Sequence, residues 1–78
     1  MFVEFIEAAM AHASYDKLDT GEYYGEIPPC PGVWATGKTV KKCQQELREV
    51  LEDWLLLKLC DGDTIPVING VDLNLQRA

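Results

Sequence analysis

The stretch from Gly32 to Thr39 reads GVWATGKT and matches the phosphate-loop pattern G-x-x-x-x-G-K-[ST] at every fixed position. In such a loop, backbone N–H groups and the lysine hold the phosphates of a nucleotide. A working loop follows a buried strand, but here the preceding residues are PPCP, and prolines cannot donate hydrogen bonds within a central strand. The four residues Val-Trp-Ala-Thr between the glycines favour a strand instead of a flexible loop. We therefore expect no nucleotide site: Gly32 turns into a short strand, Gly37 ends it, and Thr39 caps a helix.

Three lysines, Lys38, Lys41 and Lys42, gather where this helix begins. The first turn of a helix has free N–H groups that attract anions. Two interpretations stay open, a weak anion site and a cluster of solvated lysines.

Other groups that could do chemistry are sparse. The three cysteines, Cys30, Cys43 and Cys60, show no C-x-x-C spacing and are expected to be reduced thiols without zinc. Glu22 and Glu26 share a strand face about 13 Å apart, with no third acid placed to join them. The sequence therefore predicts no catalytic residue, metal or cofactor.

The chain has 78 residues and predicts one small domain. Its formal net charge of −6 disfavours nucleic acid, because phosphate contacts supply most of that affinity, and suits a basic protein partner. Its longest apolar run, Trp54 to Leu57, is far shorter than the roughly 20 residues that span a bilayer. We expect a cytoplasmic protein with no membrane association.

Hydrophobic spacing predicts the elements that position these groups. Three- and four-residue steps indicate helices over residues 2–12 and 40–61, and alternation indicates strands over 14–18, 22–27, 33–37 and 71–75. The expected fold class is α+β: an N-terminal helix, a three-stranded antiparallel meander, a long crossover helix and a fourth strand. Residues 1–12 would be a helical extension and 13–76 a β-β-β-α-β core.

The long helix carries two candidate surfaces. One side is acidic and, with two strand aromatics, could bind a partner, although the carboxylates could also be a solvated face. The candidate partner-binding residues are Glu46, Glu49, Glu52, Asp53, Tyr24 and Trp34. After Trp54 leucines surround the helix axis, and a helix that is apolar all round is buried all round. Leu56, Leu57 and Leu59 should therefore meet either a second subunit or the N-terminal helix, and we predict a homo-oligomer of at least two copies.

From Gly21 to Leu59 the chain resembles the HicB-type antitoxins of toxin–antitoxin pairs. The residues that carry the resemblance are GEYYGEIPPCPGVWATGKT, then VKKCQQELREVLEDWLLLKL and DTIP. Pro28 and Pro31-Gly32 correspond to a P-x-x-P-G turn, and Gly37-x-Thr39 corresponds to the helix entry.

The resemblance implies a partial ribonuclease-H-like fold that lacks that enzyme's active site. It also implies a partner, a small basic HicA-like toxin that cleaves messenger RNA. Longer HicB-type antitoxins carry a C-terminal DNA-binding segment, whereas this sequence reaches Ala78 just after the last expected strand, so we expect no direct DNA binding. Lys41 and Lys42 also stand where family members commonly have acidic residues.

Three functions are therefore open. The first is a non-catalytic binding module that neutralises such a toxin. The second is an orphan structural or regulatory oligomeric domain with a non-toxin partner. The third is an enzyme, a ribonuclease-H-type nuclease using carboxylates and Mg²⁺, which the scattered carboxylates disfavour.

Overall fold

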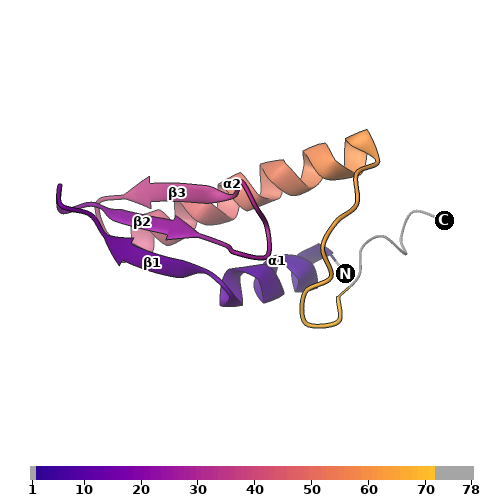
Figure 1. Cartoon of the computed structure of the whole chain (residues 1–78), viewed down its shortest axis with the longest axis horizontal. Helices are drawn as coiled ribbons and strands as arrows, with labels where there is room; N and C mark the ends of the chain where they lie inside the picture. Colours follow the sequence, from indigo (N-terminus) through magenta and orange to yellow (C-terminus); the bar gives the residue numbers. More distant parts are fainter. Residues whose placement is uncertain (1, 72–78) are drawn as a thin grey trace.

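The computed structural model describes residues 2–71 and forms one open sheet backed by helices (Figure 1). The elements, in chain order, are α1 (Phe2–Ala11), β1 (Ser14–Lys17), β2 (Tyr23–Glu26), β3 (Trp34–Gly37) and α2 (Val40–Asp61). The sheet is an antiparallel meander of order β1-β2-β3, so β1 and β3 are its two edges. The predicted α+β class, both helices and the meander are confirmed, and no predicted end of these elements is shifted by more than one residue.

Turn chemistry connects the strands as the sequence predicts. The N–H of Gly21 donates to Leu18 O at 2.9 Å in the first hairpin turn. Before β3, the N–H of Val33 donates to Cys30 O at 3.1 Å, which closes a turn over Pro31 and Gly32. Gly32 has φ of 92°, the conformation that the third residue of a type II turn requires.

The sheet has one covered and one open face. Alternation places Gly25 and Ile27 on the covered face, with Ala35 of β3, and all three are buried. Trp34 and Thr36 point to the open face and are exposed. The predicted facing of these strands is confirmed.

Helix α2 packs behind β3 and, to a lesser extent, β2 (Figure 1). Its N-terminus is capped by Thr39, whose Oγ1 accepts a hydrogen bond from the N–H of Lys42 at 3.1 Å. Its C-terminus ends at Gly62 in the left-handed conformation, with φ of 74°. The fully buried positions on the helix are Cys43, Leu47, Leu51 and Leu55. Val40, which the sequence places in this apolar stripe, is instead 44% exposed because it stands at the first helical position.

The connection from β3 into α2 is unusually close. A Cβ added at Gly37 would lie 2.5 Å from the backbone N and 2.8 Å from the Cα of Cys43. Only a residue without a side chain lets the end of β3 pass the first turn of α2 at this distance. Glycine is therefore required after β3, at Gly37, because of close packing against α2. It is required before β3, at Gly32, because of the positive φ.

Helix α1 closes the core beyond the end of the sheet. It buries Phe5, Ile6 and Ala9 in the same apolar cluster as Leu47, Leu51 and Leu55. The segment after α2 folds back against this cluster and adds two residues, Ile65 and Ile68, whose burial the sequence analysis did not anticipate. The helix expected as an extension is thus part of the core.

A tight turn follows at residues 68–71. Ile68 and Val71 exchange both backbone hydrogen bonds, at 3.3 and 2.8 Å, around Asn69 and Gly70 with positive φ. Asn69 Oδ1 also lies 3.0 Å from His12 Nε2, which ties the turn to the end of α1. Within residues 2–71 the sheet has three strands; the predicted fourth strand over 71–75 falls, apart from Val71, outside the described residues.

Candidate functional site: the groove beside strand β3

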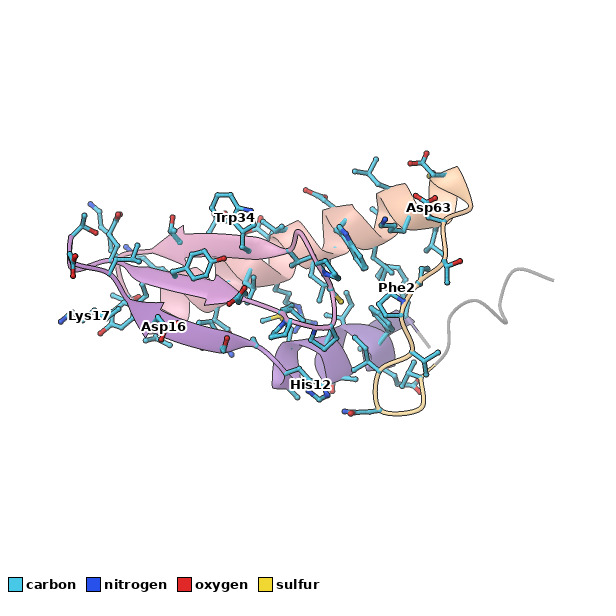
Figure 2. The ribbon with its side chains drawn as sticks, viewed as in Figure 1. Phe2, His12, Asp16, Lys17, Trp34 and Asp63 are labelled. Carbon is cyan, nitrogen blue, oxygen red and sulfur yellow. The ribbon has the colours of Figure 1, made fainter. Side chains whose placement is uncertain are left out.

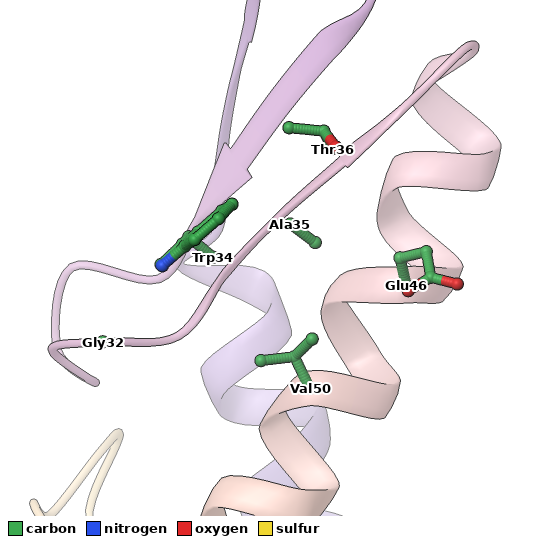
Figure 3. A pocket seen from close by; sticks show the side chains of 6 residues that line it. All are labelled: Gly32, Trp34, Ala35, Thr36, Glu46 and Val50. Atoms are coloured by element: carbon green, nitrogen blue, oxygen red, sulfur yellow. The ribbon is translucent and has the colours of Figure 1, made fainter.

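A surface groove runs between the free edge of β3 and the outer side of α2 (Figure 3). It contains a hollow of about 440 Å³ that is lined by Gly32, Trp34, Ala35, Thr36, Glu46 and Val50. Trp34, Ala35 and Thr36 come from consecutive positions of β3, and Glu46 and Val50 stand one helical turn apart on α2. This hollow therefore has a strand wall, a helix wall and, among the described residues, a single ionisable group, Glu46.

A second hollow of about 460 Å³ continues the groove toward the end of β3. It is lined by Gly37, Lys38, Lys42, Gln45, Glu46 and Glu49. Because Glu46 lines both hollows, the two form one groove along the strand, which we call the β3 groove. Its centre is acidic, and its Gly37 end carries two lysines.

The strand wall presents backbone hydrogen-bonding groups. Ile27 donates its N–H to Val33 O at 3.3 Å, and in the same register Gly25 is opposite Ala35 and Tyr23 opposite Gly37. These are the hydrogen-bonded pairs, because such pairs alternate along an antiparallel ladder. The N–H and C=O groups of Trp34 and Thr36 therefore point away from β2, toward the open edge.

Aromatic side chains extend this wall onto the open face. Trp34 is 56% exposed, and its ring stacks on that of Tyr24, with centroids 6.1 Å apart and planes inclined by 24°. Figure 2 labels Trp34 on the outer side of β3. An exposed, already ordered aromatic pair is typical of a protein-binding surface.

The predicted site residues divide into two groups. The groove brings together Trp34, Glu46 and Glu49, with Tyr24 beside them. Glu52 instead lies 3.9 Å from Arg48 Nε on a different side of the helix and lines neither hollow. Among the described residues, Glu46 and Glu49 have no ion-pair partner.

Asp53 does not line the groove, but it lies on the same helical stripe. Steps of three and four residues lead from Lys42 through Glu46 and Val50 to Asp53 and Leu57. Leu56 and Leu57 are 53% and 64% exposed, whereas Leu59 is half-buried against the core. Two of the three leucines expected at an oligomer interface, Leu56 and Leu57, are therefore exposed, and Leu59 is not.

The lysines at the start of α2 do not form a single cluster. Lys38 and Lys42 line the β3 groove, whereas Lys41 lines another hollow with Met10, Gln44, Gln45 and Arg48. The GVWATGKT stretch is a turn, a strand and a capped helix start, so the phosphate-loop match arises from structural residues, as the sequence analysis expected.

The buried thiols and the Tyr15 hydroxyl do not line the β3 groove, although Cys43 Sγ donates a hydrogen bond to Ala35 O, in its strand wall, at 3.5 Å. Burial raises the pKa of the Cys30 thiol to about 11 and also raises the pKa of Cys43. Burial, with a smaller contribution from Cys43, raises the pKa of Tyr15, whose hydroxyl has no hydrogen-bond partner among the described residues. The three cysteines are free, and only Cys60 is exposed. Raised thiol pKa values favour the protonated form, which is a poor nucleophile.

Within residues 2–71, no three His, Cys, Asp or Glu side chains are grouped as ligands for a metal ion. Neither described helix combines the length and hydropathy needed to cross a bilayer.

The backbone component of this site was not predicted from the sequence. Trp34 and Glu46 were predicted from their residue types, whereas Thr36, which contributes a backbone edge, and Val50, which contributes part of the helix wall, were not. The predicted meander already implied that β3 is an edge strand, because three strands paired in sequence order leave the first and third as edges.

Comparison with known proteins places this geometry in a family. Residues 4–66 match the UPF0150-like family. The crystal structure of TTHA0281 from Thermus thermophilus is similar over 91% of this chain and 89% of that chain, with 49% sequence identity and a TM-score of 0.86. None of the curated protein sequences gives a match. The chain therefore belongs to the UPF0150-like family, which is related to the HicB-like proteins.

Proposed function

We propose that this UPF0150-like protein is a non-catalytic binding module, a HicB-like antitoxin that binds and neutralises a small basic toxin that cleaves messenger RNA. The observation that carries the proposal is the β3 groove, where Glu46 lines one hollow with the exposed Trp34 and Glu49 lines the adjoining hollow. In the described part of the chain, neither carboxylate has an ion-pair partner. The formal net charge of −6 adds long-range attraction for a basic partner. The relation of the family to HicB-like proteins supports the same partner class.

The non-catalytic part of the proposal has its own support. Glu22 lies before β2 and Glu26 at its end, so the two acids on which a nuclease would depend are separated by the length of the strand. Metal-assisted phosphoryl chemistry needs several carboxylates around one point. Mg²⁺-dependent RNA cleavage by the purified protein, abolished by Glu22→Gln, would contradict this part.

The test is copurification with a small basic protein encoded beside this chain, followed by an assay of RNA cleavage by that protein. Wild-type protein should bind it and suppress cleavage. Glu46→Lys with Glu49→Lys should weaken binding at least tenfold, because two attractive contacts become repulsive. Glu7→Lys, at an exposed position on α1 away from the groove, is the control for a change of charge alone.

Absence of binding at low salt, or equal weakening by Glu7→Lys, would contradict a toxin partner that uses this groove. A bound protein that does not cleave RNA would favour the second candidate, an orphan oligomeric domain with a non-toxin partner. The exposed Leu56 and Leu57 favour that candidate, since two such side chains on one helix end suit a contact between copies. Light scattering at micromolar concentration tests it: a monomer would contradict it.

A further inference from the structure

The edge of β3 is open and lacks the features that usually protect an edge strand. Its four residues, WATG, include no charge and no proline, and among the described residues no other strand covers it. Natural proteins commonly block exposed edges with charges, prolines or bulges, because an open edge pairs with other strands. The edge that lacks them here is also the one that forms a wall of the β3 groove.

We propose that the β3 groove binds an extended segment of the partner as a fourth, added strand, with a basic side chain of that segment facing Glu46 and Glu49. This inference rests on the proposed function and specifies its recognition mode. The outward N–H and C=O groups of Trp34 and Thr36 supply four backbone hydrogen bonds to the segment. Charge complementarity selects the occupant, since Glu46 is the only ionisable residue within the described part of the chain that lines the first hollow.

The geometry specifies a pattern for the segment. Side chains alternate across the added strand, as they do across β3. Those on the covered side enter the groove between Ala35 and the α2 wall, where the long aliphatic stem of Arg or Lys packs on Val50 and its charge reaches Glu46. Those on the open side lie beside the Trp34 ring and suit apolar residues. Lys38 and Lys42 confine the basic part to the centre of the groove.

A second copy of this chain fits the edge less well. Paired strands lie about 4.8 Å apart, whereas packed helices need about 8–10 Å between their axes. Because α2 lies directly behind its own β3, edge-to-edge pairing of two copies would force their α2 helices together (Figure 1). It would also bring two acidic chains, each of net charge −6, into contact. An extended basic segment without such a helix avoids both costs.

The test follows amide hydrogen exchange of the full chain by NMR, with a nine-residue capped peptide that alternates Arg and Val as the probe. The peptide should slow exchange at Trp34 and Thr36 at least tenfold at saturation, because only their N–H groups face the new strand. The matched control is the other edge: Tyr15 and Lys17, whose N–H groups point outward from β1, should not change. Binding without protection of Trp34 and Thr36, or equal protection at both edges, would overturn the proposal.

Modified peptides remove the backbone contribution without any change to the protein. In one version every Arg is N-methylated and in the other every Val is, and both keep the positive charge. Because the N–H groups of alternate residues in a strand point to opposite sides, one of the two versions must lose the N–H groups that pair with β3. That version should bind about tenfold more weakly. Equal affinity for all three peptides would show attraction by charge alone and overturn the proposal.

A protein variant gives the reciprocal test. Thr36→Pro removes one outward donor while leaving the hydrogen-bonded pairs with β2 in place, since proline is tolerated where the N–H of an edge strand faces solvent. It should weaken peptide binding severalfold relative to Thr36→Val, with circular dichroism confirming the fold. If Thr36→Pro does not fold, the N-methylated peptides decide alone. Unchanged binding by a folded Thr36→Pro would count against strand addition.

Other occupants have distinct signatures in the free protein, and each would overturn the proposal. Protection of Trp34 and Thr36 that rises with protein concentration would indicate a second copy. Protection that is independent of concentration and lost on removing residues 72–78 would indicate the chain's own C-terminal segment. The strand-addition proposal and the proposed function can fail independently. If a toxin binds and is neutralised while the amides of Trp34 and Thr36 stay unprotected, strand addition is refuted and the antitoxin function is not. If the peptide adds as a strand but no toxin binds, the toxin partner is refuted and strand addition is not.

Discussion

The two edges of the sheet differ in what lies behind them and in what they carry. β3 is pressed against α2, with Ala35 buried and Gly37 in near contact with the helix backbone. β1 carries Asp16 and Lys17 at its hairpin end, and three of its four residues are exposed. A charged, weakly backed edge resists pairing with other strands, whereas an uncharged, firmly backed edge invites it. The proposed strand addition therefore predicts that the sheet can be extended at β3 and not at β1.

The largest expected effect concerns the packing of β3 against α2. Gly37→Ala should lower the free energy of unfolding by about 3 kcal/mol, because the new Cβ meets the backbone of Cys43, which cannot rotate away. In Gly25→Ala the new Cβ meets side-chain atoms, the Tyr15 ring at 2.9 Å and Cys43 Sγ at 3.0 Å, which can shift, so about 1 kcal/mol is expected. Thermal and urea unfolding measure both. A smaller loss for Gly37→Ala would show that β3 is not held more firmly than the centre of the sheet.

The second effect is a pH dependence in the turn that leads into β3. The pKa of Cys30 is raised from 9.0 to about 11 in the folded protein, so the unfolded chain loses this proton first as pH rises. The resulting stability is fully present below pH 9 and is lost as pH rises toward 11, with an upper limit of about 2–3 kcal/mol. Urea unfolding between pH 8 and 11 measures the loss.

Cys30→Ala is the control for this pH effect, because it removes the titrating group. The variant should be less stable than wild type at pH 8 but should lose less stability between pH 9 and 11. Parallel curves for the two proteins would show that water reaches this side of the core. Iodoacetamide at pH 8 should meanwhile label the exposed Cys60 much faster than Cys30 or Cys43.

The third effect separates binding from stability at β3. Trp34→Ala should weaken binding of the basic partner about tenfold, since exposed aromatic side chains commonly dominate interface energies. Its cost in unfolding free energy should be only about 0.5–1 kcal/mol, the value of a stacked cross-strand aromatic pair. Isothermal calorimetry and thermal unfolding give the two numbers. A loss of stability with unchanged affinity would assign Trp34 to the sheet alone.

The smallest expected effect comes from exchanging the charges of the two edge strands, β1 and β3. Thr36→Lys adds a protective charge to β3 and should weaken strand binding by about threefold to tenfold. Asp16→Thr with Lys17→Val removes the charges of β1 and should produce weak self-association, detectable by sedimentation as a concentration-dependent rise in mass. Unaltered behaviour of both variants would show that charge does not distinguish the two edges.

The fold was largely predictable from local chemistry, and the site only in part. Thr39 and Gly62 are residues whose capping preferences act within one turn, so the ends of α2 follow from the sequence. The burial of Ile65 depends on where the segment after α2 folds back, which no local pattern specifies. The same holds for the groove: Glu46 and Thr36 are ten positions apart, and only the packing of α2 behind β3 brings them together.

The hydrogen bond between His12 and Asn69 has a practical consequence for where a handle can be attached. It fastens the turn at residues 68–71 to α1, away from the end of the sheet where β3 leads into α2 (Figure 1). A biotin or surface linker attached at the exposed residues of this turn would therefore leave the open edge of β3 facing solution. Immobilised in this orientation, the protein becomes a directed bait for capturing whatever segment the edge selects.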